Sequence, residues 1–193
     1  LLAGIMRAWA GAGLGNTQGA IDSVVNLSGP DWFGIFQNYH GALIAQANGD
    51  IEQAKTLFQD GLNDTAGSGA APLTFLRMIR AYAAMLQSAG ELSEAQAVLE
   101  HGLTVAPTNP LLLAASAAIA VDEPIDVAPY DPAKGVAEIL LNLGSAINRD
   151  GAESFAALYL EMARASWPQE PQVLFELGST AERRDQVEIA ITY

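Results

Sequence analysis

Four glycines between residues 11 and 19 are the first in the chain whose spacing could serve chemistry. Glycine-rich turns bind phosphate when they follow a β-strand, or when they end in Gly-Lys-Ser/Thr. Here the preceding stretch "IMRAWAGA" has helical character, the third glycine of a dinucleotide-binding pattern would fall at Asn16, and no lysine is near. We therefore interpret these glycines as a turn between two helices.

The residues that usually carry catalysis or bind metals are sparse. His40 and His101 are the two histidines, and neither has an acidic or histidine partner at the spacing of a helical zinc motif. The chain has no cysteine, no serine in a nucleophile elbow, and no calcium loop, since "LNDTAGSGAAP" lacks the alternating ligands and closing glutamate. We expect no enzyme activity, no metal and no cofactor.

Arg77 and Arg80 are the basic residues with the most informative spacing. They lie one helical turn apart, in a chain with nine basic residues and a net charge of −13. A carboxylate is the natural ligand of such a pair. Nucleic acid is excluded as a partner, because no basic cluster offsets the negative charge. We expect a protein or peptide partner that is neutral or basic overall or carries a free carboxylate.

The composition predicts helices to position these residues. Half of the residues are hydrophobic and alanine is abundant, which favours helix over strand. The longest apolar run, "PLLLAASAAIAV" at residues 110–121, is too short to cross a membrane and predicts a buried helix. Because the chain begins at Leu1, we expect a fragment of a longer protein, with any signal peptide outside it. The compartment stays open between bacterial cytoplasm and periplasm.

A repeated pattern organises the helices: a turn residue, four variable residues, then alanine. The turn residues are Gly15, Gly49, Gly90, Gly151 and Asp185, and the first two and the last two are 34 residues apart. This period is typical of stacked helix pairs, with glycine reversing the chain and alanine at the helix crossing. "DIEQ" from Asp50 and "DQVE" from Asp185 also predict capped starts of the second helices.

The pattern resembles the tetratricopeptide repeat (TPR) family, and the chain as a whole is similar to long alphaproteobacterial TPR proteins. The clearest unit is "LLNLGSAINRDGAESFAALYLEMARASWP", at residues 140–168. Its matching positions are Leu140, Leu143, Gly144, Ile147, Gly151, Ala156, Leu160, Ala163 and Pro168. The resemblance implies an all-α, right-handed α-solenoid. The expected units are residues 1–30, 31–66, 70–107, an irregular helix with an acidic linker at 108–134, 135–168, and a truncated 169–193.

By this register, the first helix of each pair lines the inner, concave face. The expected partner-binding residues are Trp9, Phe36, Tyr39, Leu43, Gln46, Arg77, Arg80 and Gln87. The carboxylate clamp of chaperone-binding TPR domains is not matched, because Arg77 alone is compatible with it. The alternative, that these side chains pack against neighbouring helices or pair with nearby acids, stays open.

The sequence therefore predicts a non-catalytic protein-interaction scaffold that binds its partner on a curved helical surface. Two alternatives stay open. The chain could be a structural segment that self-associates through exposed solenoid ends, or a substrate-recruiting arm of a larger multidomain protein. No direct membrane insertion is expected in any of these cases.

Overall fold

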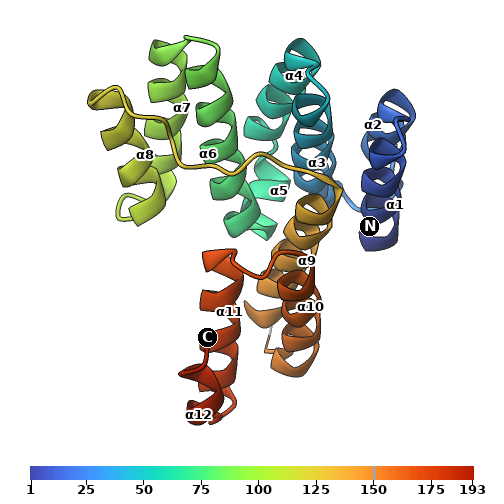
Figure 1. Ribbon diagram of the computed structural model, residues 1–193, viewed down its shortest axis with the longest axis vertical. Coiled ribbons are helices and arrows are strands. Elements are labelled where there is room, and N and C mark those ends of the chain that lie inside the picture. Colours follow the sequence, from blue (N-terminus) through green and yellow to red (C-terminus); the bar gives the residue numbers. More distant parts are fainter. Residues whose placement is uncertain (150) are drawn as a thin grey trace.

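The computed structural model describes residues 1–149 and 151–193, and this part of the chain contains α-helices and no β-strand (Figure 1). The all-α prediction is confirmed. The elements are α1 (Leu2–Gly13), α2 (Thr17–Val25), the 3-10 turn η1 (Asp31–Phe33), α3 (Gly34–Ala47), α4 (Ile51–Leu62), α5 (Thr65–Ala70), α6 (Pro72–Ser88), α7 (Leu92–Val105), α8 (Pro110–Ala120), α9 (Pro132–Arg149), α10 (Glu153–Ser166), α11 (Pro171–Arg183) and α12 (Val187–Ala190). None of the described helices is both long and apolar enough to span a membrane.

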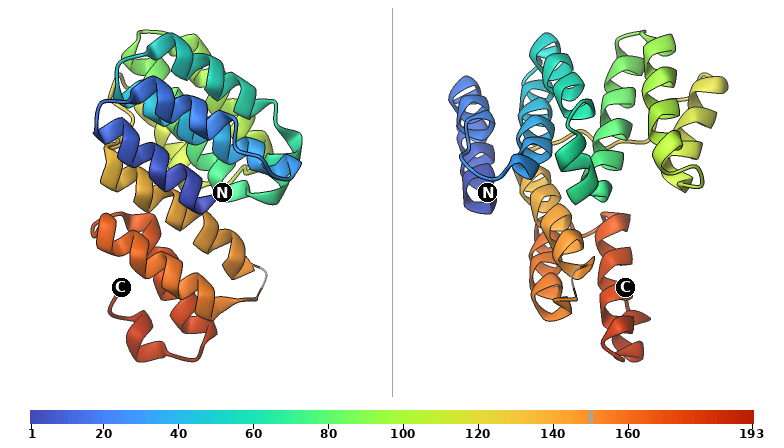
Figure 2. Two further views of the ribbon diagram at one scale, coloured as in Figure 1. Left: turned by 90° about the vertical axis from the view of Figure 1, so that its right-hand side faces the viewer. Right: turned by 180° about the vertical axis from the view of Figure 1, so that it is seen from behind.

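Consecutive helices pack as hairpins, and the hairpins lie side by side (Figures 1 and 2). The pairs are α1/α2, α3/α4, α6/α7, α9/α10 and α11/α12. Neighbouring hairpins meet where α2 contacts α3, α4 contacts α6, and α10 contacts α11. The predicted crossing alanines are buried in four of the hairpins, at Ala20, Ala54, Ala95 and Ala156. A small side chain there lets the two helices of a hairpin approach closely.

Left-handed turns end the first helix of each hairpin, as the glycine pattern predicted. The φ angles of Gly15, Gly49, Gly90 and Gly151 lie between +81° and +86°, and Asp185 has φ +57°. At Gly90, the next amide, that of Glu91, donates to the Leu86 carbonyl at 2.9 Å and closes the turn. Glycine adopts this conformation without the Cβ clash that other residues meet.

The two predicted helix caps have different outcomes. The Asp50 carboxylate accepts a hydrogen bond from the Gln53 amide at 3.1 Å, so it caps α4 as predicted. The prediction for Asp185 is wrong. This residue occupies the left-handed turn, and α12 begins after Gln186 without a side-chain cap.

We expect Gly90→Ala to lower the free energy of unfolding by about 1 kcal/mol, because alanine is strained at positive φ. A Cβ at Gly90 would meet no atom within 4 Å, so backbone strain is the main cost. Urea unfolding followed by circular dichroism measures the change. Gly69→Ala is the control, since Gly69 also faces open space but lies within α5. An equal loss in both variants would contradict the turn assignment.

Helix α8 ends in the same kind of turn, yet no second helix follows it. Asp122 has φ +58°, and the Glu123 amide donates to the Ala118 carbonyl at 2.9 Å. A helix starting after this turn would place Pro129 in its second turn, where proline lacks an amide and clashes with the preceding carbonyl. Residues 121–131, the crossing segment, instead run from the end of α8 across α6 towards α3 and α9 (Figure 1).

The crossing segment delivers α9 to the opposite end of the N-terminal hairpins. Among the helices of the N-terminal hairpins, α9 packs mainly against α1 and also contacts α3 and α6 (Figure 2). The approach to α1 is close at Gly135, where an added Cβ would lie 2.0 Å from the Trp9 ring. Buried side chains form one large core from α1 through α9 and a smaller one among α9, α10 and α11.

Candidate functional site

The predicted partner-binding residues lie on the first helices of three hairpins, α1, α3 and α6. Four of them are almost completely buried: Trp9, Phe36, Tyr39 and Leu43. Arg77 is 8% exposed, and Gln46, Arg80 and Gln87 are partly exposed. The four almost completely buried residues all belong to the main core. Five of the predicted residues contact the crossing segment or α9: Trp9, Tyr39, Arg77, Arg80 and Gln87. We call these five residues the inner face.

The crossing segment is bound to α6 through its backbone. The Gln87 side-chain amide donates to the Glu123 carbonyl at 2.7 Å, and its oxygen accepts from the Ile125 amide at 2.8 Å. Two turns earlier on the helix, the Arg80 guanidinium donates to the Asp126 carbonyl at 3.1 Å. The Ile125 side chain is 7% exposed and joins the main core. The inner face thus holds an extended polypeptide by three backbone groups and one apolar side chain.

Tyr130, near the end of the crossing segment, lies among aromatic rings from three elements. Its ring centroid is 6.5 Å from that of Trp9 and 6.0 Å from that of Trp167, the latter edge-to-face. Its hydroxyl lies 3.2 Å from the Tyr39 hydroxyl and donates to Glu138 Oε2 at 3.1 Å. Burial raises the pKa of both phenols, so both stay protonated and act as donors.

Arg77 is bound by carboxylates of its own chain. Its Nε and Nη2 each donate to one oxygen of Glu138 at 2.6 Å, and Nη1 donates to Glu170 at 2.9 Å. Tyr39 donates to the same Glu138 oxygen as Arg77 Nε, at 3.1 Å. Burial alone would raise the pKa of Glu138, but the guanidinium outweighs it and holds this pKa below its ordinary value. The group is a closed ion-pair network between α6, α9 and the start of α11.

The sequence reasoning did not identify the carboxylates of this network. Glu138 lies 61 positions from Arg77, and Glu170 lies 93 positions away. A local signal exists at Glu138, because it is a lone charge within the apolar run "VAEILL" of α9. A charge at such a position usually has a buried partner. The binding of a partner's carboxylate by Arg77 stays a prediction, while in this structure its three bonds go to α9 and Glu170.

The two histidines have different environments. His101 is exposed on α7, near the edge of Phe75. His40 is completely buried, and its Nδ1 accepts a hydrogen bond from the Trp9 indole at 3.1 Å. Its Nε2 has no partner among the described residues. Burial lowers the pKa of His40 from 6.5 to about 4, so the ring is neutral near pH 7. Over residues 1–149 and 151–193, no three potential ligands cluster to hold a metal ion.

Acidification from about pH 7 to about pH 5 should lower the free energy of unfolding by about 2 kcal/mol through His40. The pKa of His40 is about 4 in the folded state and 6.5 in the unfolded chain. Between these values the unfolded chain binds a proton that the folded protein does not bind. This stability is present above pH 6.5 and is lost as the pH falls towards 4. Urea unfolding at the two pH values measures it, with His40→Asn as the comparison. An unchanged pH dependence in His40→Asn would refute the assignment.

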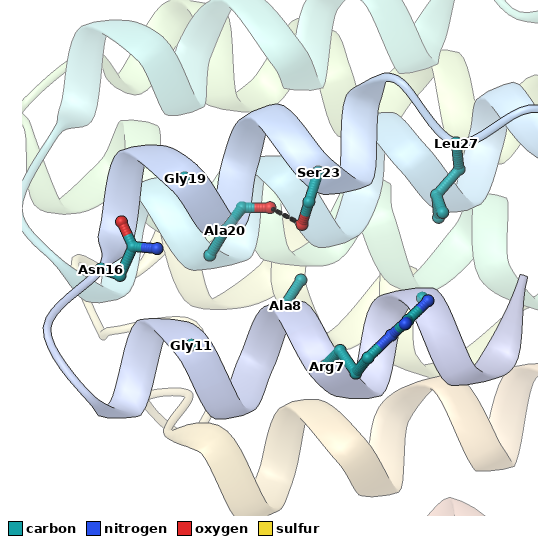
Figure 3. A pocket seen from close by; sticks show the side chains of 9 residues that line it. Arg7, Ala8, Gly11, Asn16, Gly19, Ala20, Ser23 and Leu27 are labelled. Carbon is teal, nitrogen blue, oxygen red and sulfur yellow. Dashed lines mark hydrogen bonds between the residues drawn. The ribbon is translucent and has the colours of Figure 1, made fainter.

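Two of the four glycines at residues 11–19, Gly11 and Gly19, border a shallow cleft between α1 and α2 (Figure 3). Its volume is about 300 Å³, and Gly4, Ala8, Gly11, Gly19 and Ala20 supply much of its wall. Arg7 is the one cation among the lining residues, and its Nε donates to the Ala3 carbonyl of its own helix. Gly15 faces open space in the turn. The glycines therefore form a turn and a close helix crossing, in agreement with the sequence interpretation.

Comparison of the sequence with known protein-family models gives no match, and comparison with curated proteins gives no significant match.

Proposed function

We propose that this chain is a TPR-like, right-handed α-solenoid that acts as a non-catalytic scaffold and binds a protein or peptide on its inner face. The five hairpins with left-handed turns, four of which have a buried crossing alanine, support the repeat assignment. The inner face is built from aromatic rings and arginines, the residue types that dominate protein-binding surfaces. Two of its residues, Tyr39 and Arg77, are engaged in the buried network with Glu138, an arrangement suited to fixing the shape of the face.

One observation carries the proposal: inner-face side chains already hold an extended polypeptide. The Gln87 side chain donates to the Glu123 carbonyl and accepts from the Ile125 amide, and Arg80 donates to the Asp126 carbonyl. In peptide recognition, such backbone bonds supply affinity, and pockets for side chains supply specificity. Ile125 occupies a pocket of this kind, since it is 7% exposed. These contacts form a peptide-binding geometry.

A library of short linear peptides displayed on phage tests the proposal. We expect the protein to select peptides whose affinity falls about tenfold or more in Arg80→Ala/Gln87→Ala, because three hydrogen bonds to the ligand backbone are removed. The control is Gln96→Ala/Arg164→Ala, which changes the same residue types on α7, where Gln96 is partly exposed, and on α10, where Arg164 is exposed. Selected peptides that bind both double variants equally would refute the inner face as the site.

A second candidate function, self-association through an end of the array, has its own observation. Phe175 on α11 is 67% exposed and Ile191, after α12, is 80% exposed. Both border an open, mainly apolar cleft that also includes Leu174 and Tyr193. Sedimentation equilibrium over a range of protein concentrations tests this candidate. It predicts a mass that rises with concentration and that Phe175→Ser reduces to the monomer value.

A further inference from the structure

The crossing segment occupies the surface on which a partner would bind. Its residues 123–126 take all three backbone bonds offered by Arg80 and Gln87. Its remaining anchors are Ile125, which is buried, and Tyr130, which belongs to the network with Tyr39 and Glu138. The part between these anchors is more open, since Asp126 and Pro129 are exposed. Residues 121–128 therefore have contacts that are separate from the buried network.

The acidic side chains of the crossing segment do not stabilise its position on the inner face. Asp122, Glu123 and Asp126 are exposed, and no basic side chain pairs with them among the residues that the structure describes. Arg80 bonds to the carbonyl of Asp126 rather than to its carboxylate. The three carboxylates add to a chain whose net charge is already −13. A segment with the same backbone contacts but without these charges would meet less repulsion.

Three features of the segment define what the surface accepts. The backbone is extended, because Gln87 bonds to both sides of the residue at position 124. That residue is a proline, which favours an extended chain. Proline has no backbone N–H, so this position leaves no donor without a partner. The next residue is aliphatic and inserts into the core. The acidic side chains form no hydrogen bond or ion pair with the described residues of the inner face, so these bonds do not depend on them.

We propose that residues 121–128 are a built-in competitor for the inner face, and that the partner is an extended, neutral or basic segment with a proline followed by an aliphatic residue. This inference rests on the proposed function, because it assumes that the inner face binds peptides. The partner segment displaces residues 121–128 and takes their bonds to Arg80 and Gln87. Tyr130 and the buried network stay in place, so α9 remains attached while the partner segment replaces residues 121–128 on the inner face.

The experiment separates the segment from the surface that it covers. In the open variant, residues 123–128 are replaced by the same number of glycine and serine residues, and Tyr130 is kept. Two synthetic peptides serve as probes: "VDEPIDVA", which is residues 121–128, and a neutral form with Asp122→Asn, Glu123→Gln and Asp126→Asn. Binding is followed by NMR of the isotope-labelled protein, which detects weak complexes. Circular dichroism verifies that the open variant is folded.

We expect both peptides to bind the open variant, and the neutral form to bind several-fold more tightly at low salt, with the difference shrinking as salt increases. Both peptides should bind the wild type at least about tenfold more weakly than the open variant, because the protein's own segment competes at high effective concentration. Gln87→Ala in the open variant should weaken both peptides about tenfold, since two hydrogen bonds are lost. Gln96→Ala should leave both affinities unchanged.

Other results would overturn the inference. If neither peptide shifts the resonances of a folded open variant, the inner face does not recognise this segment in trans. If the open variant nevertheless binds peptides from the phage library at Arg80 and Gln87, the proposed function stands and this inference alone fails. Equal affinity of wild type and open variant would refute competition. Should the open variant not fold, Ile125→Ser in the full chain replaces it, with the same expected order of affinities.

Discussion

Arg77→Ala is expected to lower the free energy of unfolding by about 3–5 kcal/mol, because it leaves the Glu138 carboxylate buried without its cation. The side chain of Glu138 is fully buried, and Arg77 supplies two of the four hydrogen bonds to its oxygens. Loss of the guanidinium should also raise the pKa of Glu138, since burial is then unopposed. Urea unfolding near pH 7 measures the loss.

Two further variants identify the cause of this loss. Arg80→Ala, on the same helix, should cost about 1 kcal/mol, because it removes one hydrogen bond from a partly exposed side chain. In Arg77→Met/Glu138→Leu, apolar side chains replace the ion pair, and we expect recovery of part of the stability, because Glu170 and the two phenols still lose their partners. Equal losses in Arg77→Ala and Arg80→Ala, or no recovery in the double variant, would contradict the buried network.

Trp9→Ala should lower the free energy of unfolding by about 3–5 kcal/mol, which is the usual cost of removing a buried tryptophan. The Trp9 side chain, on α1, is 1% exposed. It is surrounded by His40 of α3, Tyr130 of the crossing segment and Gly135 of α9. Its removal leaves a cavity where α1 meets α9. Thermal and urea unfolding, followed by circular dichroism, measure the change.

The chain offers a matched control for this substitution. Trp32 is 38% exposed on η1, so Trp32→Ala should cost clearly less than Trp9→Ala. Trp9→Phe should give an intermediate loss, because it keeps most of the apolar area but removes the indole donor to His40. If Trp9→Ala and Trp32→Ala had equal effects, α9 would not be anchored to α1 through this ring.

The local part of the fold could be predicted from the sequence. Left-handed turns at glycine and small residues at helix crossings depend on neighbouring positions, so the pattern around Gly49 or Gly90 predicts a hairpin directly. The helical register also brought Tyr39, Arg77 and Gln87 to a common side. Asp122 was missed as a turn residue, because aspartate adopts positive φ far less often than glycine does.

The long-range part could not be predicted in the same way. The path of residues 121–131 is set by contacts to Gln87 and Arg80 that lie 38 and 46 positions earlier in the chain. Spacing within one helix carries no information on such pairings. The charge of Glu138 in an apolar run is a local signal that was not used, and even this signal does not identify Arg77 as the buried partner.

Hydrogen exchange at the Ile125 amide tests the central claim, that the inner face holds an extended polypeptide through its backbone. This amide lies 2.8 Å from the Gln87 side-chain oxygen, outside any helix. We predict slow exchange in the wild type and fast exchange in Gln87→Ala, with the amide of buried Val98 in α7 unchanged as the internal control. Exchange of the wild-type Ile125 amide at the rate of an unstructured peptide would contradict the account.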